Sequence, residues 1–258
     1  MSRDGMPTRN IRSIEDLLFL MDDLFERDSD RWSAVAGADW WDAFYEDRAR
    51  PVPFFADKPD ENLVAILDSQ QVTVGRALDL GCGPGRNALA LAQRGFTVDA
   101  VDLSPRAVGW GSERAAARGL DVSFVCGDAF TLPPHVLTGP YDLVYDSGCL
   151  HHLAPHRRIG YLDLLDRVLA PGGFFGLACF ARGQMGSEVP DAQMYRDGRF
   201  EAGMSFSEDD LRWIFDGLDE VEIRPMVHQD RLSPLFGQEF LLTALFRKPG
   251  ARRRRTVQ

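Results

Sequence analysis

The sequence has 258 residues, 45% of them hydrophobic and 26% charged, which is enough for one α/β domain with additions and a sizeable core. Its 39 acidic residues outnumber its 29 basic ones, giving a formal net charge of −10 at pH 7. This balance argues against broad affinity for nucleic acid or an anionic membrane, which needs clustered basic charge. We therefore expect neither as a partner.

The cysteines and the N-terminus are typical of a cytoplasmic protein. The four cysteines, at positions 82, 126, 149 and 179, form no C-x-x-C pair and no zinc-type set. They lie in or just after expected strands, as packed free thiols do in a reducing compartment. We see no signal peptide and no apolar run of the roughly 18 to 20 residues that a membrane span needs. We expect a soluble, cytoplasmic protein without a bound metal.

The N-terminal part is expected to form a helical arm. Residues 13–25 place apolar side chains at helical spacing, with Ser13 as a candidate N-cap. Residues 39–55 crowd aromatic side chains beside two prolines, which stiffen an extended segment. Such a segment either packs flat over a sheet or lines a pocket for an apolar or cationic ligand, and we favour the pocket. Residues 1–59 are thus predicted to be an arm and substrate lid.

Strand patterns alternate with helix patterns from residue 76 onward. Strands are expected at 76–80, 97–102, 122–126, 141–146, 173–180, 221–227 and 238–246, with helices near 59–67, 86–94, 105–118, 156–169 and 207–217. This alternation predicts an α/β fold over residues 60–248, a Rossmann-like, doubly wound, mostly parallel sheet of seven strands. Residues 228–237 are too short for a crossover, so the last strand is expected to be antiparallel.

Two segments show no regular period. Residues 182–206 are punctuated by glycines and a proline, which predicts a long surface loop on the substrate side. Residues 249–258 include Arg252 to Arg255 and are predicted to be a disordered basic tail.

The most informative stretch is the glycine-rich turn between the first strand and the next helix. Gly81, Gly83 and Gly85 allow sharp turns with positive φ and the close approach of a ligand. The helix that begins there presents free N–H groups, which suit an anionic or polar ligand group. Several nucleotide cofactors use a G-x-G-x-G turn, so this motif alone does not say which one binds.

Acidic residues end the following strands, at the edge where open α/β sheets bind ligands. Asp102 follows Gly85 by 17 residues, and its carboxylate can accept hydrogen bonds from both hydroxyls of a ribose. Asp128 ends the third strand and can accept from an exocyclic amine. Asp146 ends the fourth strand, and residues 147–152 then bring polar groups and two histidines to the same edge.

Five motifs in this order resemble those of the class I S-adenosylmethionine-dependent methyltransferases. They are D-L-G-C-G-P-G at 79–85, the acid at 102, G-D-A at 127–129, Y-D-L-V at 141–144 and L-A-P-G-G at 169–173. The resemblance covers about residues 60–248 and implies a methyltransferase that binds S-adenosylmethionine (SAM). The turn at 85–87, the aromatic arm and residues 146–152 are similar to small-molecule enzymes, namely the thiopurine, thiol and tellurite-resistance methyltransferases.

The resemblance also implies roles for individual residues. Around the methionyl part of SAM it places Asp79, Gly81, Cys82, Gly83, Asp146 and Ser147. It gives the ribose hydroxyls to Asp102 with Leu103 beside the adenine, and the adenine edge to Asp128 and Ala129. Arg86 and Asn87, which open the helix, are implied to touch the cofactor carboxylate or the substrate.

The chemistry of methyl transfer sets what the acceptor side must supply. The methyl group of SAM is already electrophilic, so in-line alignment and exclusion of water matter most. A thiol is partly ionised near neutral pH and can react without a base, whereas a phenol or alcohol gains from one. His151 and His152 are the candidate bases, and we favour His151 because it is nearer the strand end.

Substrate contacts are expected from the arm and from the 182–206 loop. The candidates are Trp41, Phe44, Tyr45, Arg48 and Phe54 in the arm, and Met185 and Tyr195 in the loop. This aromatic and methionine lining predicts a planar or apolar small substrate.

We therefore predict a SAM-dependent methyltransferase of a small molecule, with S-methylation of a thiol favoured and O- or N-methylation as the alternative. The acidic balance disfavours a methyltransferase of nucleic acid or protein, as does the lack of an Asn-Pro-Pro-Tyr-type segment at 146–149. The intact loop, Asp102 and Asp128 disfavour a non-catalytic SAM-binding module. An NAD-dependent reductase is disfavoured because the loop is not G-x-G-x-x-G and no Tyr-x-x-x-Lys pair occurs.

Overall fold

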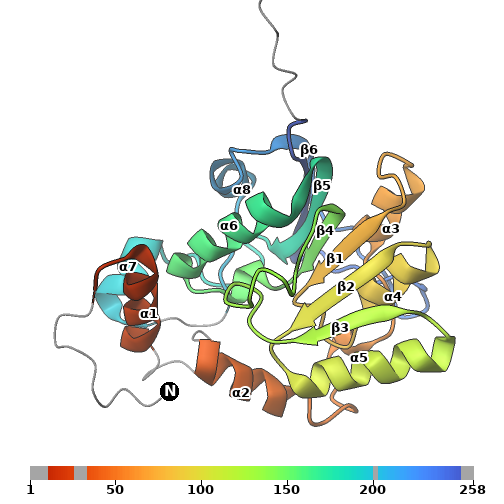
Figure 1. Ribbon diagram of the computed structural model, residues 1–258, viewed down its shortest axis with the longest axis horizontal. Coiled ribbons are helices and arrows are strands. Elements are labelled where there is room, and N and C mark those ends of the chain that lie inside the picture. Colours follow the sequence, from red (N-terminus) through yellow and green to blue (C-terminus); the bar gives the residue numbers. More distant parts are fainter. Residues whose placement is uncertain (1–10, 26–33, 200–202, 251–258) are drawn as a thin grey trace, which may run out of the picture.

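The computed structural model describes residues 11–25, 34–199 and 203–250, which form a central sheet with helices on both sides (Figure 1). The strands are β1 (Arg76–Leu80), β2 (Thr97–Asp102), β3 (Val122–Cys126), β4 (Tyr141–Ser147), β5 (Leu169–Phe180), β6 (Asp219–Pro225) and β7 (Leu241–Arg247). The α-helices are α1 (Ile14–Phe25), α2 (Ala34–Phe44), α3 (Glu61–Asp68), α4 (Arg86–Gln93), α5 (Pro105–Arg118), α6 (Arg158–Val168), α7 (Asp191–Asp197) and α8 (Glu208–Ile214). Short 3-10 helices lie at Pro53–Phe55, Leu150–His152 and Pro155–Arg157.

The sheet confirms the predicted Rossmann-like architecture. Its seven strands, all within the described residues, follow the order β3-β2-β1-β4-β5-β7-β6. β1 to β5 are parallel, and β7 runs antiparallel to both β5 and β6. The chain order reverses at β1, between β2 and β4, so the loops after β1 and β4 open side by side at the topological switch point.

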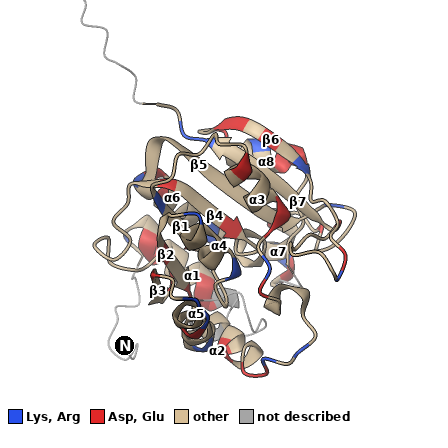
Figure 2. Ribbon diagram, turned by 90° about the vertical axis from the view of Figure 1, so that its right-hand side faces the viewer, with Lys and Arg blue, Asp and Glu red and all other residues tan. Residues whose placement is uncertain are grey.

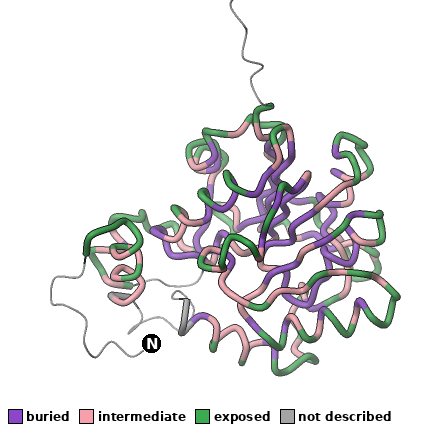
Figure 3. Tube along the Cα trace, viewed as in Figure 1, coloured by how far each residue is buried: buried purple, intermediate pink, exposed green. Residues whose placement is uncertain are grey.

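Alternating side chains of the strands build a core on each face of the sheet. Successive residues of a strand point to opposite faces. On one face Leu78 belongs to a buried cluster with Leu164 of α6 and Leu211 of α8. On the other face Ala77 belongs to a cluster with Leu91 of α4. Figure 3 shows the buried trace running through the sheet, with exposed segments at the outer turns of the helices.

The central strands and the edge strand differ in how many charged residues they carry. In Figure 2 β5 is tan along its length, whereas β6 carries several acidic and basic positions. β6 is mostly exposed, and β7 is buried except for its last residue. β7 therefore occupies a core position between β5 and the exposed edge strand, which accounts for its apolar sequence.

The aromatic arm is helical where we expected an extended segment. Trp40 and Phe44 lie one helical turn apart on α2, and their rings stack with centroids 5.2 Å apart. The prolines act only after the helix, where Val52 is extended and Pro53 opens a 3-10 helix. The end of the arm packs on α5, because Tyr45 and Phe55 share a buried cluster with Ala107. Parts of the expected arm at 1–10 and 26–33, and of the expected tail at 251–258, lie outside the described residues.

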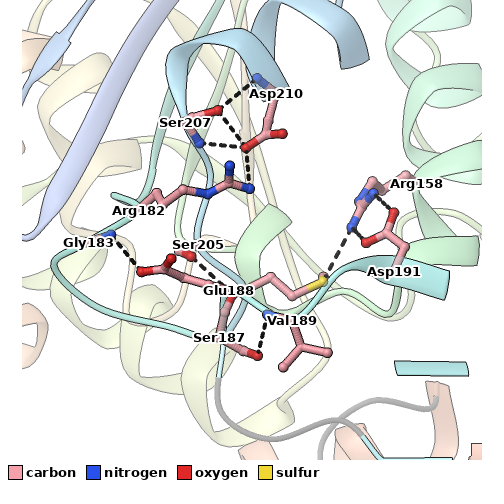
Figure 4. A network of polar contacts seen from close by, with 11 residues as sticks. Arg158, Arg182, Gly183, Ser187, Glu188, Val189, Asp191, Ser205, Ser207 and Asp210 are labelled. Atoms are coloured by element: carbon pink, nitrogen blue, oxygen red, sulfur yellow. Dashed lines mark hydrogen bonds and ion pairs between the residues drawn. The ribbon is translucent and has the colours of Figure 1, made fainter. Parts of the chain in front are cut away.

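The 182–206 segment also contains more regular structure than the surface loop that the sequence predicted. It contains α7, with Pro190 before the helix and Gly198 as a left-handed C-cap. Figure 4 shows how ion pairs hold the described part of the segment: Arg182 to Asp210 at the start of α8, and Arg158 of α6 to Asp191. Ser187 pairs with Met204 through an isolated bridge. The sequence pattern failed here because a seven-residue helix is too short to show a period.

Candidate active site

A cavity of about 270 Å³ lies at the carboxyl ends of the parallel strands. The loops that follow β1, β2, β3, β4 and β5 line it, together with the aromatic arm and the segment before β7. In the described part of the chain, its charged lining residues are three acids and two arginines, Asp79, Asp102, Asp128, Arg86 and Arg157. Most of the other lining side chains are apolar or aromatic.

The glycine turn after β1 forms the floor of this cavity. Gly81, Gly83 and Gly85 have φ of +70°, +52° and +77°, a region that residues with a side chain rarely adopt. A Cβ at Gly81 would lie 2.7 Å from the Cβ of Cys149, and one at Gly83 would lie 2.9 Å from the hydroxyl oxygen of Tyr45. The loop therefore lies directly against the β4 loop and the arm.

Asp79 ties the end of β1 to the first turn of α4. Its Oδ2 accepts a hydrogen bond of 2.8 Å from the backbone N–H of Ala88. Burial raises the pKa of Asp79 to about 7, although the Ala88 N–H and Arg86 act in the opposite direction. The side chain is thus both a structural acceptor and a cavity-lining carboxyl group.

Asp102 connects the end of β2 with the glycine turn. Its Oδ2 accepts from the N–H of Gly83 at 2.8 Å, and its Oδ1 accepts from the N–H of Ser104 at 2.9 Å. Burial raises the pKa of Asp102. Each carboxylate oxygen has a second lone pair, so these bonds orient the group and leave it able to accept from two hydroxyls.

Arg86 and Asn87 meet at a buried aspartate that sequence analysis missed. Asp60 is fully buried and takes an ion pair from Arg86, which is 6% exposed. The Asn87 Oδ1 accepts from the N–H of Asp60 at 3.0 Å, and the Tyr145 hydroxyl donates to Asp60 at 2.8 Å. A second nitrogen of Arg86 donates to Ser147 Oγ at 2.9 Å. Asp60 resembles an N-cap in the sequence, but its side chain makes no capping bond to α3.

The two histidines after β4 both line the cavity but have different surroundings. His151 is 4% exposed and stacks on Phe180, with ring centroids 3.7 Å apart. Its Nδ1 accepts from the backbone N–H of Phe180 at 3.2 Å. Because a backbone N–H can only donate, the neutral ring of His151 carries its proton on Nε2. The His152 ring packs edge-on against Trp41 at 5.0 Å.

Aromatic residues from distant parts of the chain complete the wall. Trp41, Tyr45 and Phe54 line it from the arm, as predicted. Phe180 at the end of β5 and Phe236 before β7 join them, and neither was expected. The rule that ligands bind at strand ends could have pointed to Phe180. Only the insertion of β7 beside β5 brings the segment with Phe236 to the cavity.

Residues 77–173 match a family model described as a methyltransferase domain. The matched part of the chain is a methyltransferase domain. The domain match begins in β1 and ends in β5, so it contains the glycine turn, Asp102, Asp128 and the two histidines.

Curated relatives and a solved structure agree with this assignment. The chain is 40% identical over 123 residues to an uncharacterized methyltransferase of Synechocystis sp., covering 48% of this chain and 52% of the relative. It is 32% identical over 133 residues to the 2-heptyl-1-hydroxyquinolin-4(1H)-one methyltransferase of Mycobacteroides abscessus, covering 51% and 57%. The chain thus spans about half the length of these relatives. A structure from work on the conversion of a disulfide bond into a thioacetal group during echinomycin biosynthesis has 26% identity, a TM-score of 0.63, and coverage of 82% of this chain and 91% of its own.

The cavity gathers most of the predicted site residues. Those that line it are Trp41, Tyr45, Phe54, Asp79, Gly81, Cys82, Gly83, Arg86, Asn87, Asp102, Leu103, Asp128, Ala129, Ser147, His151, His152 and Met185. Phe44, Arg48, Asp146 and Tyr195 do not line it. Arg48 pairs with Glu113 on the outside of α5, and Tyr195 of α7 contacts His156.

Asp146 departs furthest from its expected role beside the methionyl group. Its carboxylate turns into the core, where it accepts from the N–H groups of Cys149 at 2.7 Å and Leu150 at 3.0 Å, and from the Tyr161 hydroxyl at 2.7 Å. Burial raises the pKa of Asp146 to about 7. The residue closes the turn that carries the histidines, because the N–H groups of that turn need a buried acceptor.

Residues 11–25, 34–199 and 203–250 contain neither a metal-binding cluster nor a membrane-spanning helix. No group of three or more His, Cys, Asp or Glu side chains there is placed to hold a metal ion. Within the same ranges, no helix combines the length and the apolar character needed to cross a membrane.

Proposed function

We propose that this protein transfers a methyl group from SAM to a small, largely apolar acceptor. The observation that carries the proposal is the cavity in which the glycine turn, Asp102 and Asp128 meet an aromatic wall. The methyltransferase domain over residues 77–173 supports the same activity. The formal net charge of −10 argues against nucleic acid as the acceptor.

The residues of the cavity suit SAM part by part. Gly81 and Gly83 allow the loop to approach the methionyl part closely, and Asp102 is oriented to accept from the ribose hydroxyls. Asp128 offers an acceptor for the exocyclic amine of adenine, and Arg86 offers a cation for the carboxylate. When bound, SAM supplies an electrophilic methyl group on a sulfonium. The protein then needs to align the nucleophile with the methyl carbon and exclude water.

The acceptor side is best suited to a planar or apolar molecule. Trp41, Phe54, Phe180 and Phe236 supply ring faces and edges, and Met185 adds an adaptable side chain. The relative from Mycobacteroides abscessus is named for a quinolone with a heptyl chain, a substrate of this general character. Rings of this kind hold a flat molecule by stacking, so they define its plane while the histidine turn meets its polar edge.

His152 is the better candidate for a general base, although both histidines remain in the proposed site. A base must offer an unprotonated nitrogen, but the neutral ring of His151 already accepts from the Phe180 N–H and keeps its proton on Nε2. His151 is therefore suited to donate a hydrogen bond. A hydrogen-bond donor at this position stabilises a methyl acceptor that arrives ionised, which favours S-methylation of a thiolate. O- or N-methylation is the alternative, with His152 as the base.

Two measurements test the proposal. Calorimetry should show that the protein binds SAM and S-adenosylhomocysteine (SAH). A methyl-transfer screen over thiols, phenols, catechols and amines should then give a product heavier by one methyl group, detected by mass. Failure of both cofactor ligands to bind would refute the proposal. Transfer that occurs only to nucleic acid or protein would refute the small-molecule acceptor.

The histidine assignment has its own test. His152→Ala should flatten the dependence of rate on pH if the acceptor needs a base, while His151→Ala should lower the rate without removing that dependence. The opposite pattern would return the base to His151.

A further inference from the structure

The carboxylate of Asp128 is held by two different donors. Its Oδ1 accepts from the backbone N–H of Phe130 at 3.1 Å, and its Oδ2 takes an ion pair from Nη2 of Arg157. The side chains of Asp128 and Arg157 are each 9% exposed, and both residues line the cavity. The orientation of Asp128 is therefore determined inside the cavity rather than by solvent.

Arg157 divides its guanidinium between two acids. While Nη2 meets Asp128, Nη1 donates to Oδ2 of Asp22 at 3.1 Å. Burial opposes the charge of Arg157, but the carboxylates of Asp128 and Asp22 outweigh it and raise its pKa. Arg157 is thus a buried cation shared by the cavity and by α1, which contributes Asp22.

Asp22 is in turn fixed by His156, which is itself held by α7. Its Oδ1 lies 2.6 Å from Nε2 of His156, in the 3-10 helix before α6. The hydroxyl of Tyr195, on α7, lies 2.8 Å from Nδ1 of His156 and accepts the backbone N–H of His156 at 2.8 Å. Figure 1 shows α1 and α7 at the same edge of the molecule, and both helices contact His156. Asp22, His156 and Tyr195 therefore hold one end of the Arg157 guanidinium.

This anchoring matters because of how guanidinium and carboxylate groups pair. A free arginine beside an aspartate forms a bidentate pair, with two N–H groups on both carboxylate oxygens. That geometry would add a second donor to Oδ1, which already accepts from the Phe130 N–H, and would leave only one lone pair of the carboxylate, on Oδ2. With Nη1 held by Asp22, Arg157 reaches only Oδ2 of Asp128 in the structure. Lone pairs of Asp128 then remain for a donor in the cavity.

We propose that Arg157, anchored by Asp22 of α1, is a positioning residue that orients Asp128 to accept the exocyclic amine of adenine. This inference rests on the proposed function, since it assumes that the adenine of SAM reaches Asp128. It assigns α1 to recognition of the cofactor, whereas the sequence placed the whole arm on the acceptor side. Loss of Asp22 releases Arg157 to occupy Asp128 and weakens recognition of the amine.

The test compares two ligands that differ only at this amine. SAH carries the 6-amino group, whereas S-inosylhomocysteine carries a carbonyl oxygen that cannot donate to Asp128. Calorimetry on the full-length protein should show that the wild type binds SAH more tightly. Asp22→Asn, which keeps the size of the side chain, should reduce this preference by roughly tenfold. Asp128→Ala should abolish it, and Glu15→Gln, an exposed change on the same helix, should leave it intact.

The outcomes separate this inference from the proposed function. If the wild type binds neither ligand, the proposed function fails and the inference fails with it. If Asp22→Asn weakens both ligands by the same factor, Asp22 has only a structural role and the inference alone is refuted. Should Asp22→Asn prove poorly folded by circular dichroism, Arg157→Gln gives the same comparison, with an unchanged preference again refuting the inference.

Discussion

Replacing Asp60 should destabilise the protein far more than replacing an exposed partner of another arginine. Asp60 is fully buried and Arg86 is 6% exposed, so Asp60→Ala leaves a charged guanidinium in the interior without its counter-ion. It also removes one of the two acceptors of the Tyr145 hydroxyl, the other being Asn62. Breaking a buried pair in this way costs about 3–5 kcal/mol of the free energy of unfolding. At a slope of about 3 kcal/mol per M urea, the midpoint should fall by about 1 M or more.

A matched control comes from Asp68, which pairs with Arg94 on the surface. These side chains are 60% and 43% exposed, and such pairs contribute about 0–1 kcal/mol. Urea denaturation followed by circular dichroism, without cofactor, measures both variants against the wild type. If Asp60→Ala costs no more than Asp68→Ala, the reasoning about the buried pair is refuted.

Three further predictions concern the carboxyl groups and the glycine turn. Because the pKa of Asp146 is raised to about 7 by burial, the folded state binds its proton more tightly than the unfolded state. The protonated Asp146 stabilises the folded state at pH 4, and this stabilisation is lost as the pH rises to about 7. The free energy of unfolding of Asp146→Asn should therefore increase relative to that of the wild type over this range. A difference between the two that stays constant with pH would contradict the reasoning. Gly81→Ala should lower the free energy of unfolding by roughly 1–3 kcal/mol more than Gly119→Ala. Both glycines have positive φ, but only a side chain at position 81 would also clash with Cys149. Equal shifts in melting temperature would show that the close approach to Cys149 is unimportant. Asp102→Ala should weaken SAH binding by about 10- to 100-fold in calorimetry, and near-normal affinity would disprove the ribose assignment.

The fold could be predicted because its signals are local. The strands at 76–80, 97–102 and 122–126 have the predicted bounds, since each is a short segment rich in apolar residues and bounded by a turn. The antiparallel direction of β7 followed from the short connection before it. Its insertion between β5 and β6 could not be predicted, because strand order depends on which faces are left to be covered.

In the candidate site, the residues at the strand ends could be predicted for a similar reason. Asp79, Asp102 and Asp128 line the cavity because parallel strands end at one edge, so residues at strand ends meet. The direction in which a side chain points after the strand end could not be predicted. Ser147 lines the cavity, whereas Asp146 points into the core to satisfy the N–H groups of the next turn.

By itself, the sequence determined the α/β alternation, the glycine turn and the acids at the strand ends, because periodicity and spacing act over a few residues. Only the tertiary structure decided which distant side chains pair. Asp60 meets Arg86 across 26 residues, and Asp22 meets His156 across 134. Such pairs depend on strand order, helix packing and burial together, so no local pattern in the chain reports them. The glycine turn lines the cavity, and packing around it decides how its neighbours are oriented.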